Sequence, residues 1–160
     1  MRRTSTGWCT VVVDDTIRIE VTNRDVRRIL KAFRDLPKDA SDELRDANQR
    51  IADALAAKVA AAATASDAQS ALMAQTVQSR RDRVPVVVAG GRQKVGSRRT
   101  PAYKILYGSE FGATYWRQFR PHRGAASYWL FRTVRENEDD TVTDWAHVAE
   151  AIARKWGHAT

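Results

Sequence analysis

The sequence predicts an α+β fold in which an N-terminal β-hairpin, a long Ala-rich helix and a C-terminal helix pack on a small, mainly antiparallel sheet. Three observations predict it: two β-branched runs near the N-terminus, an alanine-rich stretch with apolar residues at helical spacing, and a C-terminal stretch with the same spacing. A chain of 160 residues can bury one core, so we expect residues 1–160 to form a single domain.

The first elements are a hairpin and a short helix. Residues 8–13 (WCTVVV) and 16–21 (TIRIEV) are rich in β-branched side chains and flank an Asp-Asp pair suited to a tight turn. Thr22 or Asn23 can then serve as an N-cap, and apolar residues recur at helical spacing until Pro37 ends the helix. These apolar residues are Val26, Ile29, Leu30 and Phe33.

Two longer helices are predicted, one central and one C-terminal. The central helix runs from residue 39 to about residue 65, with the apolar stripe Leu44, Ile51, Leu55, Val59 and Ala62. Because alanine lets backbones approach closely, this helix either crosses another helix or packs flat on a sheet. The C-terminal helix follows from apolar residues recurring between Trp145 and Trp156, with acids before it and bases at its end.

The middle of the chain is predicted to be extended. Residues 72–79 and 84–89 are expected to form two strands, and residues 102–106 a third. Pro85 places the second strand at a sheet edge, or places its own residue outside the hydrogen-bonded ladder. Residues 90–101 (GGRQKVGSRRTP) combine glycine, proline and basic residues without an apolar period, which predicts an exposed, mobile basic loop.

Positive charge is concentrated between residues 80 and 104. The whole chain has 27 Lys and Arg against 19 Asp and Glu, a net charge of +8. In this segment Asp82 stands alone among basic residues, which are Arg80, Arg81, Arg83, Arg92, Lys94, Arg98, Arg99 and Lys104. Such a segment can follow phosphates by counterion release without reading bases, or it can be a solvated loop that keeps the protein soluble. No recognition helix, zinc finger or aromatic RNA-binding signature accompanies it.

Nothing in the sequence predicts an active site. His122, His147 and His158 have no partner at a catalytic spacing, and Ser109 lacks the flanking glycines of a nucleophile elbow. Cys9 is the single cysteine, which excludes an internal disulfide and a paired-cysteine zinc site. We therefore expect no catalytic residue, no metal and no cofactor. The sequence also shows no signal peptide or membrane span, so we expect a cytoplasmic protein without membrane contact.

Residues 107–124 (YGSEFGATYWRQFRPHRG) combine aromatic residues, glycines and arginines with one acid, Glu110. Gly108 and Gly112 are expected to let the chain turn sharply around Glu110 and Phe111. Protein interfaces are enriched in arginine and aromatic residues. The composition of this stretch therefore favours contact with a protein over the reading of bases.

From about Val12 to Trp156 the chain resembles the neck or tail-completion family of minor structural proteins in long-tailed double-stranded DNA phages. The resemblance rests on LRDANQRIADALAAKVAAAA, on VPVVVAGG and above all on YGSEFGATYWRQFRPHRGAASYWLFRTVRE. In that family a Glu-Phe-Gly stretch, here starting at Glu110, is followed by an Arg-x-Phe-x-Pro segment, here starting at Arg117. An aromatic strand, here residues 128–131, and a terminal helix then complete the pattern.

The resemblance implies a non-enzymatic subunit of a homo-oligomeric ring at the phage head-tail junction, where it would join the head connector to the tail around the DNA path. Its partners would be copies of itself, adjacent head-completion or connector proteins, tail-terminator or tail-tube proteins, and double-stranded DNA contacted without sequence preference. It would belong to the virion neck, assembled in the bacterial host cytoplasm. A ring subunit of this kind needs two different docking surfaces.

The resemblance also implies roles for particular residues. The expected subunit interface consists of Glu110, Phe111, Trp116, Arg117, Phe119, Arg120 and Arg123. Its aromatic residues, with Trp129, would divide between core and intersubunit contact, and its arginines would meet carboxylates of a neighbour. The expected contacts with the DNA channel or a partner are Arg80, Arg81, Arg83, Arg92, Lys94, Arg98 and Arg99. The alternative is a small basic nucleic-acid-binding regulatory protein, and an enzyme with a cleft around His122 is a third hypothesis.

Overall fold

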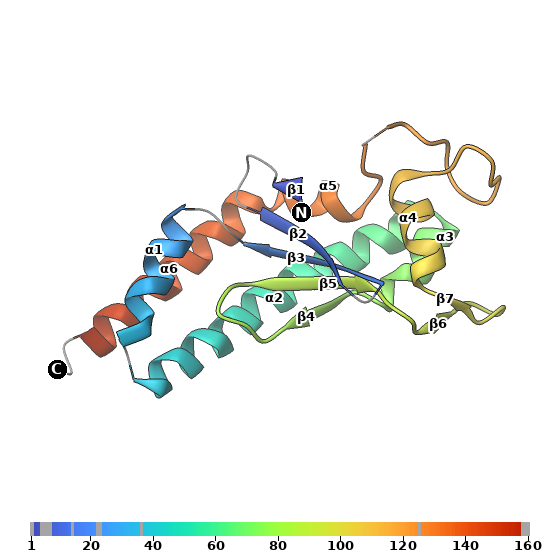
Figure 1. Ribbon diagram of the computed structural model, residues 1–160. Helices are drawn as coiled ribbons and strands as arrows, with labels where there is room; N and C mark the ends of the chain where they lie inside the picture. The colour runs from blue at the N-terminus through green and yellow to red at the C-terminus, as the bar shows by residue number, and fades with distance from the viewer. Residues whose placement is uncertain are drawn as a thin grey trace.

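In a computed structural model the chain has a mixed α+β fold, with helices packed around a small antiparallel sheet (Figure 1). The structure describes residues 2–3, 8–13, 15–21, 24–35, 37–124 and 126–157. The fold class predicted from the sequence, with its N-terminal hairpin, long helix and C-terminal helix, is confirmed.

The main sheet has the strand order β1-β2-β3-β5-β4 within the described residues, and all its neighbouring strands are antiparallel. The strands are β1 (Arg2–Arg3), β2 (Trp8–Val13), β3 (Thr16–Val21), β4 (Gln78–Arg80) and β5 (Val86–Gly90). The predicted hairpin is β2–β3, with Asp15 at a φ of 64° in its turn. Ile17 and Ile19 lie opposite Ala89 and Val87, and each of the four side chains is 1% exposed, which places the core on this face of the sheet.

The predicted long helix is α2 (Lys38–Ser66), and it contacts both the sheet and other helices. On one side it packs against β4 and β5, where Ser79 shares a face with Val87 and hydrogen bonds to side chains of α2. On the other side it packs along α5 (Leu130–Glu136) and α6 (Glu138–Gly157). The alanines of α2 therefore serve both of the expected purposes, because small side chains allow close approach on either side.

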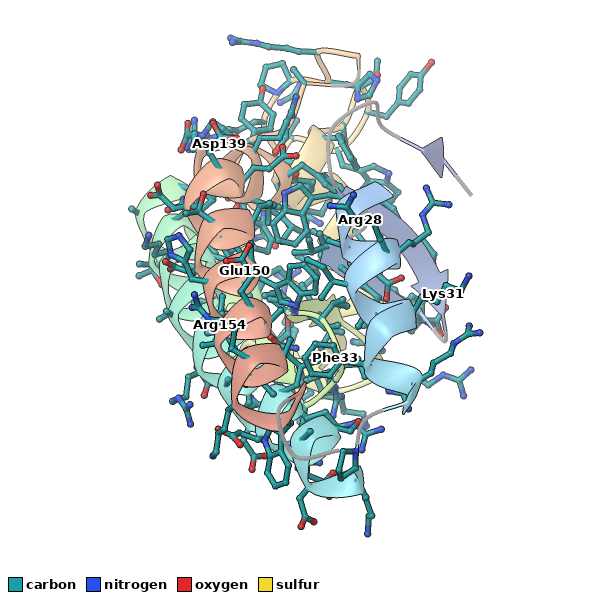
Figure 2. The ribbon with its side chains drawn as sticks, turned by 90° about the vertical axis from the view of Figure 1, so that its left-hand side faces the viewer. Arg28, Lys31, Phe33, Asp139, Glu150 and Arg154 are labelled. Atoms are coloured by element: carbon teal, nitrogen blue, oxygen red, sulfur yellow. The ribbon has the colours of Figure 1, made fainter. Side chains whose placement is uncertain are left out.

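The predicted short helix is α1 (Arg24–Ala32), continued by the 3-10 turn η1 (Phe33–Asp35). Val26 and Phe33 point into the core, with exposed fractions of 1% and 6%. The expected N-cap residues Thr22 and Asn23 lie outside the described residues. Figure 2 shows α1 and α6 side by side at the end of the molecule where the C-terminus lies.

The predicted strand at residues 72–79 is wrong for most of its length. Residues Ala68–Ala74 form helix α3 instead. The carboxylate of Asp67 caps this helix by accepting the backbone N–H groups of Gln69 at 2.9 Å and Ser70 at 3.0 Å. A good N-cap followed by helix-forming Ala, Leu and Met outweighs the extended pattern, and the strand β4 keeps only the last part of the run.

The predicted strands at residues 102–106 and 128–131 are also wrong. Residues Tyr103–Phe111 form helix α4, which buries Ile105, Leu106, Ser109 and Glu110 on one face at helical spacing. The second run leads directly into α5, which begins at Leu130. Aromatic and β-branched residues favour strands only weakly, so packing and capping decide the conformation here.

Pro85 takes one of its two expected positions, whereas the basic segment that follows β5 differs from expectation. Of the two alternatives for Pro85, the sheet edge is wrong, because β5 lies between β3 and β4. The other is confirmed, because Pro85 immediately precedes β5 and lies outside its ladder. Residues 90–101 are largely exposed, as expected, but they form a hairpin of β6 (Lys94–Val95) and β7 (Thr100–Pro101) rather than an unstructured loop. Val95 is 2% exposed and fixes this hairpin to the body of the protein.

Candidate interaction surface

The β6–β7 hairpin, helix α4 and the loop between α4 and α5 meet at one end of the molecule (Figure 1). We call the loop, residues 112–129, the aromatic loop; the structure describes its residues 112–124 and 126–129. In Figure 1 it projects beyond α4, at the end opposite α1 and the C-terminal half of α6. The contacts that fix this loop determine which side chains it exposes.

Glu110, near the end of α4, holds the far end of the aromatic loop. Its side chain is 0% exposed. One carboxylate oxygen, Oε2, accepts the backbone N–H groups of Trp129 at 3.2 Å and Leu130 at 2.8 Å. The other, Oε1, accepts the N–H of Phe131 at 2.9 Å and the hydroxyl of Ser127. These N–H groups belong to the start of α5, where no carbonyl of the helix can serve them, so Glu110 caps α5 from a different helix.

Burial raises the pKa of Glu110 above its ordinary 4.5, and hydrogen bonds from Ser127, Phe131, Leu130 and Trp129 offset part of the rise. The raised pKa means that the folded chain binds this proton more tightly than the unfolded chain does. Protonation of Glu110 therefore adds to the free energy of unfolding, and this contribution is complete below a pH of about 4.5. It is lost as the pH rises through the raised pKa.

We therefore expect the free energy of unfolding of the wild type to fall, relative to that of Glu110→Gln, as the pH rises from about 4 to about 7. The glutamine variant does not titrate at this position, so the difference isolates the Glu110 proton. Urea unfolding of both proteins at several pH values measures it. If the wild type instead becomes more stable relative to Glu110→Gln as the pH rises over this range, the pKa of Glu110 is not raised in the folded chain.

Two glycines shape the near end of the aromatic loop. Gly112 ends α4 with φ 74° and ψ −179°, a conformation that essentially only glycine adopts. A Cβ at this position would lie 2.4 Å from the carbonyl oxygen of Arg120 and 2.5 Å from that of Pro121. The expected sharp turn is thus confirmed at Gly112. It is wrong for Gly108, which lies within α4 and makes room for the ring of Phe119, since a Cβ there would be 2.7 Å from that ring.

Arg120 fixes the middle of the aromatic loop to the junction of α2 and α3. Its guanidinium lies 3.3 Å from the carboxylate of Asp67 and donates to the carbonyl of Ser66. It also lies 4.9 Å from the ring centroid of Tyr128, in cation–π geometry. The hydroxyl of Tyr128 in turn donates to the carbonyl of Pro121 at 2.7 Å. Arg120 therefore acts within its own chain.

The loop fixed in this way exposes aromatic side chains. Tyr115 is 90% exposed and Trp116 is 68% exposed, whereas Trp129 and Trp145 are almost completely buried. Trp116 also lines an open cleft of about 960 Å³, together with Ile105, Gly108, Phe111 and Phe119. Exposed apolar surface beside a cleft is typical of a site that binds another molecule.

The elements that meet at this end of the molecule also carry exposed cations. They come from the β6–β7 hairpin, from α4 and from the aromatic loop, and they are Lys94, Arg98, Arg99, Lys104, Arg117 and Arg123. All six are exposed, and within the described part of the chain none of them forms an ion pair. We call these cations, with Tyr107, Tyr115 and Trp116, the basic-aromatic face. The nearby acids Glu110 and Asp67 already have partners in the same chain.

The residues predicted for a subunit interface take three different positions. Those exposed on the basic-aromatic face are Trp116, Arg117 and Arg123. Those lining the cleft include Phe111 and Phe119. Glu110 and Arg120 bind other parts of the same chain, so they shape the surface rather than form it. Trp129, at 0% exposure, belongs to the core.

The basic segment predicted as one unit is divided by β5. Arg80 pairs with Val86 at the start of this strand, so Arg80, Arg81 and Arg83 lie near one end of it. The other predicted contacts follow Gly90 at its far end and lie on the hairpin: Arg92, Lys94, Arg98 and Arg99. A strand of this length separates the two groups by about 16 Å. Arg81 is also paired, with Asp46 at 2.6 Å, so the segment is not one continuous basic surface.

Sequence reasoning missed several residues of the site. Tyr107 and Tyr115 belong to the basic-aromatic face but were not among the expected contacts. A pair of aromatic residues in a stretch rich in glycine and arginine was the available signal for Tyr115. Asp67 and Ser127 were missed as anchors of the aromatic loop, and no local pattern reveals them, because their partners lie far away in the sequence.

Comparisons with protein-family models, with curated proteins and with solved structures find no match for this chain. Among the described residues, no helix is long and apolar enough to cross a membrane. Nor does the described part of the chain bring three or more His, Cys, Asp or Glu together as a metal site. The fold and the surface thus define the chain as an α+β protein with a fixed loop that presents a basic-aromatic face.

Proposed function

We propose that the protein is a structural, non-enzymatic subunit that assembles with copies of itself into a ring at the head-tail junction of a long-tailed phage. The ring would surround the DNA path and join the head connector to the tail. The resemblance of residues 107–136 to the neck and tail-completion family supports this proposal. The observation that carries it is that these same residues build the aromatic loop and expose Trp116 and Tyr115 on it.

A fixed loop with exposed aromatic and arginine side chains suits protein association. Binding energy at interfaces is concentrated in a few residues, and Trp, Tyr and Arg are enriched among them. Association also costs conformational entropy, and the cost is lower when the contacting loop is already held in place. Glu110, Gly112 and Arg120 hold the aromatic loop through contacts within the chain.

Trp116→Ala is expected to weaken self-association by about thirtyfold or more, as for a residue at the centre of an interface. The free energy of unfolding should change by less than about 0.5 kcal/mol, because the Trp116 side chain is mostly exposed in the single chain. Sedimentation velocity over a dilution series measures the association, and urea unfolding measures the stability.

Trp116→Phe is the matched control, since it keeps an aromatic ring at the same position. We expect it to retain most of the association. If Trp116→Ala assembles as well as the wild type, the aromatic loop is not the contact between subunits.

A second candidate function is nucleic-acid binding, which the exposed cations of the β6–β7 hairpin favour. Exposed aromatic rings beside cations can also stack on the bases of a single strand. The division of the basic segment by β5 argues against one long phosphate track. Measuring both DNA binding and assembly in variants of the basic-aromatic face separates the two functions.

A further inference from the structure

Charge is distributed very unevenly along the chain. From residue 83 to residue 135, the one acid is Glu110, among eleven Lys and Arg. From residue 136 to residue 153 the order is reversed, with six acids and no Lys or Arg. The first segment contains the basic-aromatic face, and the second contains most of α6.

Helix α6 carries an acidic stripe on its solvent side. The residues of this acidic stripe are Asp139, Asp140, Asp144 and Glu150, and all four are exposed. Acids in the first turn are explained by the helix dipole, but its influence ends within that turn. It therefore does not account for Asp144 or Glu150. Neither of these two has an ion-pair partner within the described part of the chain.

The acidic stripe and the basic-aromatic face lie on different sides of the molecule. Figure 2 looks at the end away from the hairpin and α4, and there Asp139, Glu150 and Arg154 follow one another along α6. In Figure 1 the hairpin, α4 and the projecting part of the aromatic loop occupy the opposite end. Two complementary surfaces on different sides of one subunit permit head-to-tail contact, which closes into a ring when the rotation between subunits allows it.

We propose that the basic-aromatic face of one copy docks on the acidic stripe of α6 in the next copy. The inference rests on the proposed function and specifies its subunit contact. Arg117 and Arg123 provide the planar guanidinium groups that pair well with carboxylates. Trp116 and the adjoining cleft provide apolar contact at the centre, with the charged groups around it.

A second copy fits these surfaces better than a nucleic acid does. The complementary acids are present in the same chain, on a surface that the fold leaves exposed. The cleft beside Trp116 is lined largely by apolar groups, including Ile105 and Phe119, and can receive apolar side chains of a protein. A phosphate backbone would use the cations and leave this cleft unfilled.

A charge-swap experiment on the full chain tests the docking. The face variant reverses three cations: Lys104→Glu, Arg117→Glu and Arg123→Glu. The stripe variant reverses three acids: Asp140→Lys, Asp144→Lys and Glu150→Lys. Each variant alone opposes like charges, so we expect self-association to weaken by about a hundredfold. An equal mixture pairs opposite charges at every contact and is expected to recover assemblies of the wild-type mass.

The control variant reverses three exposed cations outside both surfaces: Lys31→Glu, Arg34→Glu and Arg50→Glu. It should assemble as the wild type does, and circular dichroism should show all variants folded. Assembly by both single variants, or no recovery in the mixture, would overturn the docking while leaving ring assembly in place. A wild type that stays monomeric would overturn the proposed function as well. If the face variant keeps its mass but loses binding to labelled double-stranded DNA, the face binds nucleic acid instead.

Discussion

Glu110→Ala is expected to lower the free energy of unfolding by about 3 kcal/mol, because it leaves buried backbone donors without an acceptor. The donors are the N–H groups of Trp129, Leu130 and Phe131, all at the start of α5. Removing a buried partner costs the desolvation of each group left behind, whereas an exposed carboxylate can be replaced by water. For a chain of this size the change corresponds to a fall in Tm of about 6–12 °C.

Urea unfolding of the variant and the wild type measures this effect. Glu136→Ala is the matched control, since it removes a glutamate from an exposed position of α5 outside the acidic stripe and should change stability by less than about 0.5 kcal/mol. Hydrogen exchange gives a second readout, because the first amides of α5 should lose protection in Glu110→Ala. Equal stability of the two alanine variants would show that Glu110 does not cap α5.

Gly112→Ala is expected to destabilise the protein by about 3 kcal/mol or more, through two additive causes. The backbone at Gly112 has a conformation that a Cβ disfavours, and the new Cβ would lie 2.4 Å from the carbonyl oxygen of Arg120. Backbone atoms on both sides of this contact leave little room for adjustment. The loop must therefore open at its start, which would also displace Trp116.

Gly124→Ala separates the two causes. Gly124 also has a positive φ, 65°, but no described residue beyond its chain neighbours lies within 4 Å of a Cβ built there. Its replacement should cost only the conformational term, about 1 kcal/mol. Thermal unfolding of both variants measures the difference, which we expect to be about 2 kcal/mol. Equal destabilisation would mean that the close contact between Gly112 and residues 120–121 does not form.

The elements predicted correctly are those with a strong local pattern. The hairpin β2–β3 was predicted from its two β-branched runs, and the helices α2 and α6 from the spacing of their apolar residues. In α2 the predicted stripe is buried at Leu44, Leu55 and Val59, but Ile51 and Ala62 are only half-buried. Residues 102–106 were predicted as a strand, but Tyr103–Phe111 form helix α4. Its helical form depends on packing against distant segments, which no local pattern contains.

The candidate site could be predicted in composition but not in arrangement. The aromatic and arginine content of residues 107–124 is enough by itself to indicate a contact surface. The roles of Glu110 and Arg120 depend on partners brought close by folding: the start of α5 for Glu110, and Asp67 for Arg120. A buried carboxylate and an exposed one look alike in a sequence, so Glu110 was expected at the surface and lies inside.

We propose above that the basic-aromatic face joins copies of this chain. The most direct test is the mass distribution of the purified wild type over a dilution series, measured by mass photometry at low and at high salt. We expect a species at a fixed multiple of the 18.0 kDa chain, which dissociates on dilution and when salt screens the charges. A mass of 18.0 kDa at every concentration and salt would contradict the claim.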